Sequence, residues 1–379
     1  MHKSLASNAF TLSIFLILFL SIFIGWTQSK LKSEGYFLKP ICVKIQSGEN
    51  INSVSTRLAK LELITSPVIF RIGASYTKKS RLLKAASFLI PAKSSMLEII
   101  KLITDGGKNT CGKEVLYKIG VTSEKIVVRN FNPNTGKYLE TLNFNLKDDV
   151  TPKSYIDLTN EQGVRYRIII AEGVSSWRII EAIKNADFLT GSVRKISREG
   201  SLAPNSYEVG FGSTRESVIE RMENKQNDIL SKAWESRDLT SPLKTPEEAL
   251  ILASIIEKET GLPEERGLVA SVFTNRIKNN MRLQTDPSVI YGLTKGRKVL
   301  GRGLKRSELI LDTPYNTYIN TGLPPTPITN PGKLAILAAL NPDKTDYLFF
   351  VANGSGGHAF AKDLKTHNKN VNTWRDLNK

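Results

Sequence analysis

Hydrophobic and polar positions along the chain alternate in two spacings that predict short strands followed by helices. Residues 43–45 alternate as in a strand, and Ile51, Val54 and Leu58 then follow at helical spacing. A second copy of this pattern begins at residues 168–173. Each copy is completed by an aromatic-apolar strand and a further helix, so the predicted unit is strand, helix, helix, strand, helix.

This repeated unit resembles the LysM module, a small glycan-binding fold. The two copies would occupy residues 40–107, as a membrane-proximal unit, and residues 166–240. A small packing module without a ligand is the alternative. Between the copies, residues 108–165 form a predicted β-rich insert, because alternating apolar residues flank an Asn-Pro-Asn-Thr-Gly loop at 132–136, which is typical of a β-hairpin.

The longest apolar run, residues 9–26, contains no charged side chain. As a helix it is long enough to cross the roughly 30 Å of hydrocarbon in a bilayer, with Trp26 at the interface. A cleaved signal peptide is the alternative, but no small-x-small cleavage site follows closely. We therefore expect residues 9–27 to be an uncleaved single-pass anchor after a short N-terminus, residues 1–8. The flanking charges do not fix its orientation.

A helix with a complete start signal is predicted from residue 245. Thr245 is a suitable N-cap, Pro246 fits the first helical position and Glu248 completes a capping box. The helix should run to Thr260 and stop at Gly261. We assign residues 241–379 to a C-terminal mixed α/β catalytic domain, which makes the whole chain an α+β protein.

Composition narrows the possible partners. The formal net charge is +17, which favours anionic partners, but the cations are scattered without the interleaved aromatic residues of a nucleic-acid surface. We expect a solvated basic surface and no nucleic-acid partner. Cys42 and Cys111 could pair only in an oxidising compartment, and two unpaired core cysteines are expected instead. The three histidines give no metal-binding pattern, so we expect neither metal nor cofactor.

Two carboxyl groups on the predicted helix are candidate catalytic acids. Glu257 and Glu259 are two residues apart, about 200° around a helix axis, so they face nearly opposite ways and cannot act as a pair. Periodicity does not choose between them. Apolar surroundings would raise the pKa of either carboxyl and keep it protonated, as a general acid requires. The alternative is that both are ordinary helix glutamates paired with Lys258, Arg266 or Arg276.

Two later segments contain side chains suited to holding a sugar. Amides, hydroxyls and carboxylates bind hydroxyl and acetamido groups, and an aromatic ring can stack on a sugar face. The alternatives are a helix cap at Asp286 and a structural loop at residues 313–318. A glycine-rich segment before His358 lacks the Lys-Ser/Thr of a phosphate loop. The candidate substrate-binding residues are Gln284, Thr285, Asp286, Tyr291, Tyr315 and Asn316.

These motifs together resemble the endolytic murein transglycosylase family, the MltG or YceG-like proteins. The resemblance implies an inner-membrane protein whose soluble part lies in the periplasm and cleaves nascent glycan strands internally, ending their elongation. It implies peptidoglycan strands and peptidoglycan synthases as partners, and Glu257 as the catalytic residue. The insert at 108–165 lies outside the core pattern. The matching runs are 253–260, 269–276, 283–292, 314–318, 322–325, 330–332 and 338–342.

The number of candidate acids bears on the reaction type. Ordinary glycosidases use two carboxylates, because one must activate or replace water. A lytic transglycosylase needs one, since the muramic acid 6-hydroxyl closes onto C1 and leaves a 1,6-anhydro end. One candidate acid without a clear partner therefore favours the lyase. The rival functions are a membrane-tethered, non-catalytic peptidoglycan-binding scaffold and an inverting hydrolase.

Overall fold

The computed structural model describes residues 2–46, 48–105, 110–146, 150–159, 161, 163–194 and 196–377, with side chains from residue 14 onward. The chain divides into two compact units. The first comprises Met1–Val115, Val127–Asn143 and Val150–Arg165, and the second comprises Leu116–Ile126, Phe144–Asp149 and Tyr166–Lys379. Helices and strands occur in both, so the chain is a mixed α+β protein, as predicted.

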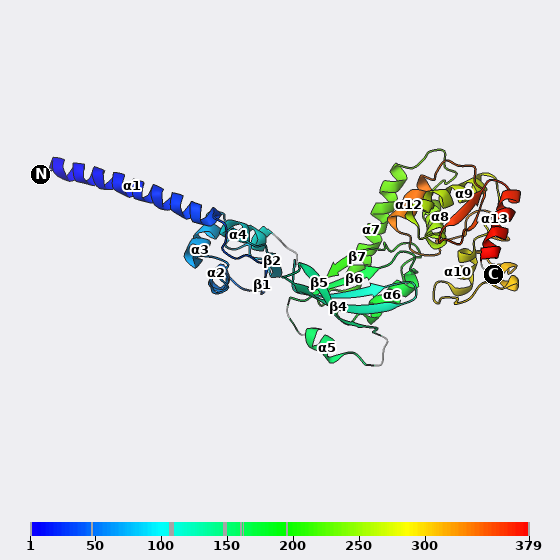
Figure 1. The fold of residues 1–379 in the computed structure, drawn as a ribbon, viewed down its shortest axis with the longest axis horizontal. Helices are drawn as coiled ribbons and strands as arrows, with labels where there is room; N and C mark the ends of the chain where they lie inside the picture. The colour runs from blue at the N-terminus through cyan, green and yellow to red at the C-terminus, as the bar shows by residue number, and fades with distance from the viewer. Residues whose placement is uncertain are drawn as a thin grey trace. The chain divides into compact units, whose positions relative to one another are not determined.

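The first unit opens with an apolar helix that continues into a small module (Figure 1). The element order of the module is the predicted strand, helix, helix, strand, helix. β1 and β2 pair antiparallel, with Val43 opposite Phe88, and both side chains lie in the core. The elements are α1 (His2–Lys32), β1 (Ile41–Ile45), α2 (Ile51–Lys60), α3 (Pro67–Tyr76), β2 (Ala86–Ile90) and α4 (Met96–Asp105).

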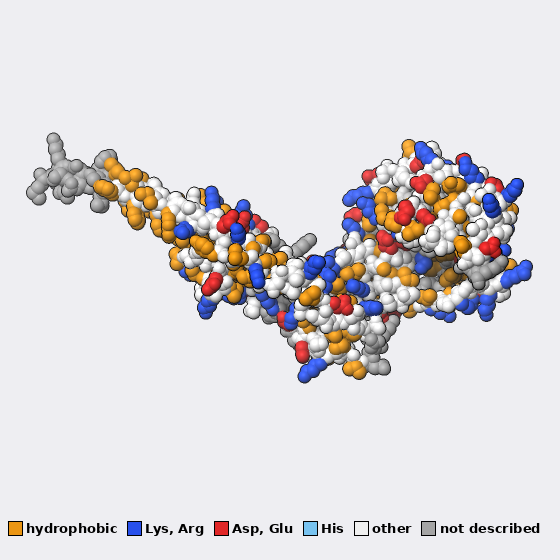
Figure 2. Space-filling model, viewed as in Figure 1, with side chains coloured by type: hydrophobic (Ala, Val, Ile, Leu, Met, Phe, Trp, Pro, Cys, Tyr) orange, Lys and Arg blue, Asp and Glu red, His pale blue; other side chains and the backbone are white. Residues whose placement is uncertain are grey.

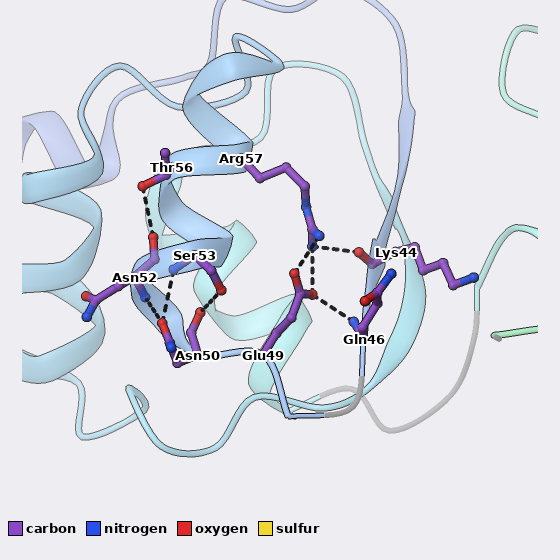
Figure 3. A network of polar contacts seen from close by, with 8 residues as sticks. All are labelled: Lys44, Gln46, Glu49, Asn50, Asn52, Ser53, Thr56 and Arg57. Carbon is purple, nitrogen blue, oxygen red and sulfur yellow. Dashed lines mark hydrogen bonds and ion pairs between the residues drawn. The ribbon is translucent and has the colours of Figure 1, made fainter.

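A polar network fixes the turn between β1 and α2 (Figure 3). Arg57 donates one hydrogen bond to each carboxylate oxygen of Glu49, at 2.6 and 2.9 Å, and a third to the Lys44 carbonyl at 2.7 Å. Asn50 caps α2 by accepting from the backbone N–H groups of Asn52 and Ser53. Because a bidentate Arg–carboxylate pair restrains both side chains, α2 is held against the end of β1.

Helix α1 combines an exposed apolar part with an end packed into the module. Side chains such as Phe15, Phe19 and Ile22 are exposed, and the described part of α1 is largely hydrophobic on its surface (Figure 2). Residues Ile14–Lys32 are long and apolar enough to cross a membrane, so α1 is a candidate anchor. Leu31, near its end, is buried in the core of the module, so anchor and module are joined by packing as well as by the chain.

The two cysteines form a disulfide, so the expectation of two unpaired core cysteines is wrong. Cys42 and Cys111 are bonded with their Cα atoms 5.9 Å apart. Thr110, which precedes Cys111, lies beside β2: its N–H donates to the Ser87 carbonyl and its hydroxyl accepts from the Leu89 N–H. Leu89 pairs with Cys42 across the sheet. Separation along the sequence therefore misled the prediction, because pairing with β2 brings the two cysteines together.

Five strands form a sheet in the order β5-β4-β3-β6-β7. β4 and β5 are neighbours across the loop at 133–136, which confirms the predicted hairpin. The second copy of the repeat differs from the prediction, because the described residues between α6 and β7 contain no second helix. The elements are β3 (Lys113–Ile119), β4 (Glu124–Asn132), β5 (Lys137–Phe144), α5 (Lys153–Thr159), β6 (Arg165–Ile170), α6 (Ser176–Asn185), β7 (Ser206–Val209) and α7 (Arg215–Glu235).

A helical core occupies the C-terminal part of the second unit. α8, α9 and α12 pack together there, burying Leu252, Phe273 and Ile336 completely or nearly so (Figure 1). A two-stranded sheet of β8 and β9 follows α12 in the sequence. The elements are α8 (Pro246–Glu259), η1 (Pro263–Glu265), α9 (Arg266–Lys278), α10 (Asp286–Thr294), α11 (Arg306–Leu309), α12 (Lys333–Leu340), β8 (Phe349–Ala352), β9 (His358–Ala361) and α13 (Leu364–Leu377).

Candidate active site

Helix α8 carries both candidate acids and has the predicted cap at Thr245, but the Glu248 carboxylate accepts from the Lys244 N–H and does not close the predicted capping box. The Thr245 hydroxyl accepts a hydrogen bond from the Glu248 N–H at 3.1 Å, and Pro246 occupies the first turn. Residues 249–256 are all buried. Ser254 fixes the helix against a later loop, because its hydroxyl accepts from the Ile328 N–H at 3.0 Å. A helix enclosed on every side holds the glutamates at its end in fixed positions.

Glu257 lies among charged neighbours in a nearly closed setting. Its side chain is 6 % exposed, and one carboxyl oxygen accepts a hydrogen bond from the Gly332 N–H at 2.9 Å. Burial raises the pKa of Glu257 and the nearby Glu172 carboxylate acts in the same direction, against the Gly332 N–H and Arg266. The Arg266 guanidinium lies 3.8 Å from Glu257 and 3.7 Å from Glu172, bridging the two carboxylates.

Glu259, on a different face of α8, lies against the predicted sugar-binding segment. The Thr285 hydroxyl donates a short hydrogen bond to its carboxyl group. Burial raises the pKa of Glu259 and Asp286 adds to the increase, while the Thr285 hydroxyl, His358 and Arg276 oppose it. A buried carboxyl with a raised pKa beside hydroxyl and carboxylate groups is suited to proton transfer.

The segment that precedes α10 is tied to the loop at 313–318. The Thr285 N–H donates to the Thr317 hydroxyl at 3.0 Å, and the Tyr318 hydroxyl donates to Asp286 at 2.6 Å. Thr285, rather than Asp286, is the residue before the first turn of α10. Thr285, Asp286 and Tyr318 therefore form one polar surface beside Glu259, which we call the polar wall.

Two of the predicted aromatic residues form a second cluster. The rings of Tyr291 and Tyr315 lie 5.1 Å apart, and Lys295 lies 3.9 Å above the Tyr315 ring. The Tyr315 hydroxyl is 2.9 Å from the Thr326 hydroxyl, and the Tyr291 hydroxyl is hydrogen-bonded to Glu199. Burial raises the pKa of Glu199, opposed chiefly by the Ser176 N–H. Glu199 gave no signal in the sequence, because it precedes a glycine in an irregular segment.

The remaining predicted site residues have different surroundings. Asn316 is fully buried, and its amide donates to the Leu309 and Leu311 carbonyls at 3.0 and 2.8 Å. Those bonds hold the loop and leave its amide committed to the backbone. Gln284 is exposed with a φ of 50°, and its N–H donates to the Thr317 carbonyl at 3.0 Å. The chain bends sharply there, immediately before the polar wall.

A carboxylate–imidazole pair, also missed in the sequence, lies next to Glu259. His358 Nδ1 is 2.6 Å from one carboxyl oxygen of Glu265, and the His358 N–H donates to the other at 2.8 Å. Burial acts to raise the pKa of Glu265, but the two hydrogen bonds from His358 outweigh it and lower that pKa. A metal-binding group of three or more acidic, histidine or cysteine side chains does not occur among the described residues.

Comparison with known proteins gives a consistent set of relatives. The YceG-like family model matches residues 113–373. Endolytic murein transglycosylases of two Streptococcus pneumoniae strains are 28 % identical over 340 residues, covering 88 % of this chain and 58 % of theirs. The Bacillus subtilis endolytic murein transglycosylase is 42 % identical over 173 residues, 45 % of this chain and 46 % of that one. The chain thus spans little more than half the length of the pneumococcal relatives.

Among solved structures, a yceG-like protein of Listeria monocytogenes is 28 % identical and covers 88 % of this chain and 99 % of its own, with a TM-score of 0.45. The family match corrects one expectation, because it begins at residue 113 and so includes most of the insert that we placed outside the pattern. The physical reason is that β3 and β4 of the insert belong to the same sheet as β6 and β7. Since the family model covers well over half of the sequence, the chain belongs to the YceG-like family.

Proposed function

We propose that this chain is a membrane-anchored lytic transglycosylase that cleaves peptidoglycan strands internally, between N-acetylmuramic acid and N-acetylglucosamine. The observation that carries the proposal is a buried carboxyl of raised pKa on α8, held against the polar wall. The names of the relatives, endolytic murein transglycosylases, support the same reaction.

The proposed reaction needs one carboxyl group. The protonated glutamate donates its proton to the oxygen that leaves between the two sugars, and the C1–O bond breaks. The resulting carboxylate takes the proton of the muramic acid 6-hydroxyl, whose oxygen bonds to C1. The carboxyl group is thereby restored, water is not consumed, and the product has a 1,6-anhydro end. Proton transfer of this kind typically accounts for about 10²–10⁴-fold in rate.

Glu257 is the catalytic residue that the sequence resemblance implies, and Glu259 is the one that the contacts favour. The Gly332 N–H and Arg266 both favour the charged form of Glu257 and hold its carboxyl against the backbone. Glu259 instead contacts Thr285 and lies near Asp286, two residues suited to a sugar. We therefore propose Glu259 as the acid and base of the reaction, with Glu257 as the competing candidate.

We also propose that α1 crosses the inner membrane once and leaves the two units in the periplasm. The apolar helix at Ile14–Lys32 supports the anchor. The disulfide between Cys42 and Cys111 supports an oxidising compartment for the soluble part, because disulfides persist there and are rare in the cytosol.

The direct test is to incubate purified glycan strands with the full chain in detergent and to analyse the products by mass spectrometry. Strands shortened internally, with anhydro-muramic ends, are expected. Reducing muramic ends, one water heavier, would show a hydrolase instead. Unchanged strands that nevertheless bind the chain would favour the rival function, a peptidoglycan-binding scaffold built on the LysM-like module of the first unit.

A further inference from the structure

The second unit contains a pocket of about 360 Å³ that the proposed reaction does not use. Its walls include the apolar side chains of Val121, Pro287 and Ile290 and the ring of Tyr291. The pocket therefore offers aliphatic surface and one aromatic ring to a small ligand, such as a short peptide or one or two sugar rings.

The charged side chains that line this pocket are all cationic. Those described are Arg178, Lys258, Arg297, Lys298 and Arg302, and the described lining includes no Asp or Glu. Glu308 neutralises Arg302, with an N–O distance of 2.6 Å. In the described part of the chain, no carboxylate forms an ion pair with Arg297 or Lys298, whereas the charge of Glu257 partly offsets that of Lys258. Several uncompensated cations facing one cavity favour an anionic ligand.

One of these cations has a fixed direction. The Arg178 Nε donates a hydrogen bond to the Gly120 carbonyl at 2.7 Å, which holds the guanidinium at the pocket wall. Restraining a cation before the ligand arrives reduces the entropy lost on binding. Arg178 is thus a preorganised donor to an anion, whereas Arg297 and Lys298 are exposed and free to adjust.

The pocket adjoins Glu257 and shares helix α10 with the polar wall beside Glu259. Gly173 lines it, and a methyl group placed on Gly173 would lie 3.8 Å from both Glu257 Cγ and Lys258 Cδ. Lys258 lies between the two glutamates on α8. Helix α10 supplies Pro287 and Tyr291 to the pocket, while its first residue, Asp286, belongs to the polar wall. The pocket and the polar wall therefore share one helix, α10.

We propose that this pocket binds carboxylates of the peptide attached to the muramic acid, so that the chain selects peptide-bearing strands over bare glycan. The inference rests on the proposed function, since it assumes a peptidoglycan substrate. The peptide in peptidoglycan hangs from the lactyl group of muramic acid and combines short aliphatic side chains with free carboxylates. That combination matches a pocket with an aliphatic wall and unpaired cations.

The test compares binding of a disaccharide-tetrapeptide with binding of the same disaccharide without its peptide, using the full chain in detergent micelles. The peptide-bearing ligand should bind about tenfold or more tightly, and the difference should shrink as salt screens the charges. The double variant Arg297→Ala with Lys298→Ala should lose about tenfold for the peptide-bearing ligand, at about threefold for each exposed ion pair.

A matched control removes two cations elsewhere. Lys225→Ala with Lys232→Ala changes the charge equally on exposed positions of α7, away from the pocket lining, and should bind as the wild type does. Equal affinity of the wild type for the two ligands would overturn the proposal, as would an equal loss in the two double variants. Tighter binding of a peptide-free strand that ends in pyrophosphate would assign the pocket to phosphate and also contradict it.

The same ligands separate this proposal from the proposed function. Binding is measured without cleavage, so a preference for the peptide-bearing ligand in a chain that cuts no strand would reject the lyase and keep the pocket. Normal cleavage without a preference for the peptide-bearing ligand would keep the lyase and reject the proposed role of the pocket.

Discussion

At the scale of single residues, the function depends on which glutamate of α8 meets the substrate. Glu257 and Glu259 are both buried enough to have raised pKa values, so desolvation alone does not separate them. Their partners do. A backbone N–H and Arg266 hold Glu257, whereas Glu259 receives the hydroxyl of Thr285 from the polar wall.

The first prediction concerns a matched pair of substitutions. Glu259→Gln should lower the rate of strand cleavage by about 10³-fold or more, because Gln neither donates nor retakes a proton. Glu257→Gln should retain most activity, since its side-chain oxygen can still accept from the Gly332 N–H. Cleavage rates and melting temperatures of both purified variants are the measurements.

The opposite pattern would contradict the geometric assignment. An inactive Glu257→Gln variant and an active Glu259→Gln variant, both with a normal melting temperature, would support the assignment made from the sequence resemblance. If both variants cleaved strands normally, the acid would lie elsewhere, and Asp286 would be the next residue to test.

The second prediction follows from the raised pKa of Glu259. A carboxyl whose pKa is raised by folding contributes its stability below the unfolded-state value, about 4.3 for Glu, and loses it as the pH rises through the folded-state pKa. Glu259→Gln has no such loss. The melting temperature of the variant should therefore rise relative to that of the wild type as the pH increases above about 4.3. A difference independent of pH would show that folding does not raise this pKa.

At this scale the sequence named candidate residues but not the partners that each one has in the fold. Glu259, Thr285 and Asp286 were all named as candidates, and the structure brings them together. Asn316 was named as a sugar ligand, but its amide is committed to two backbone carbonyls. Such contacts join residues far apart in the chain, so local sequence patterns do not predict them.

At the scale of secondary-structure elements, the disulfide links β1 to the segment before β3. We predict that Cys42→Ser with Cys111→Ser destabilises the first unit by about 2–4 kcal/mol, because the unfolded chain is no longer restrained by a closed loop. Thermal unfolding of the full chain with and without a reductant measures this. The wild type should become less stable in reductant, and the double variant should not respond. Identical curves for both proteins would show that the bond is not formed.

Elements with strong local signals were predictable, and an element that depends on tertiary contacts was not. The hairpin of β4 and β5 and the start of α8 follow from turn and capping residues. Among the described residues between α6 and β7 the second helix of the second repeat is missing, and this segment contains Gly191 and Gly200 at positive φ. Glycines in that conformation interrupt a helix, so the repeat pattern overestimated the likeness of the two copies.

At the scale of the whole molecule, the candidate anchor determines where the chain acts. We predict that the full-length protein remains in the membrane fraction after washing with high salt or alkali and is released by detergent. The reason is the apolar helix, whose residues 9–26 carry no charge, because lipid rather than charge would hold such a segment. N-terminal sequencing of the extracted protein is the control. A mature soluble form beginning near Ser29 would identify the segment as a cleaved signal peptide.

The central claim is that one carboxyl group on α8 cleaves glycan strands without water. Mass spectrometry of strands incubated with the full chain in H₂¹⁸O tests it most directly. The account predicts internally shortened strands whose new ends are 1,6-anhydro-muramic acid, with no ¹⁸O incorporated, and no such products from Glu259→Gln. New reducing muramic ends that carry ¹⁸O would contradict the claim and establish a hydrolase.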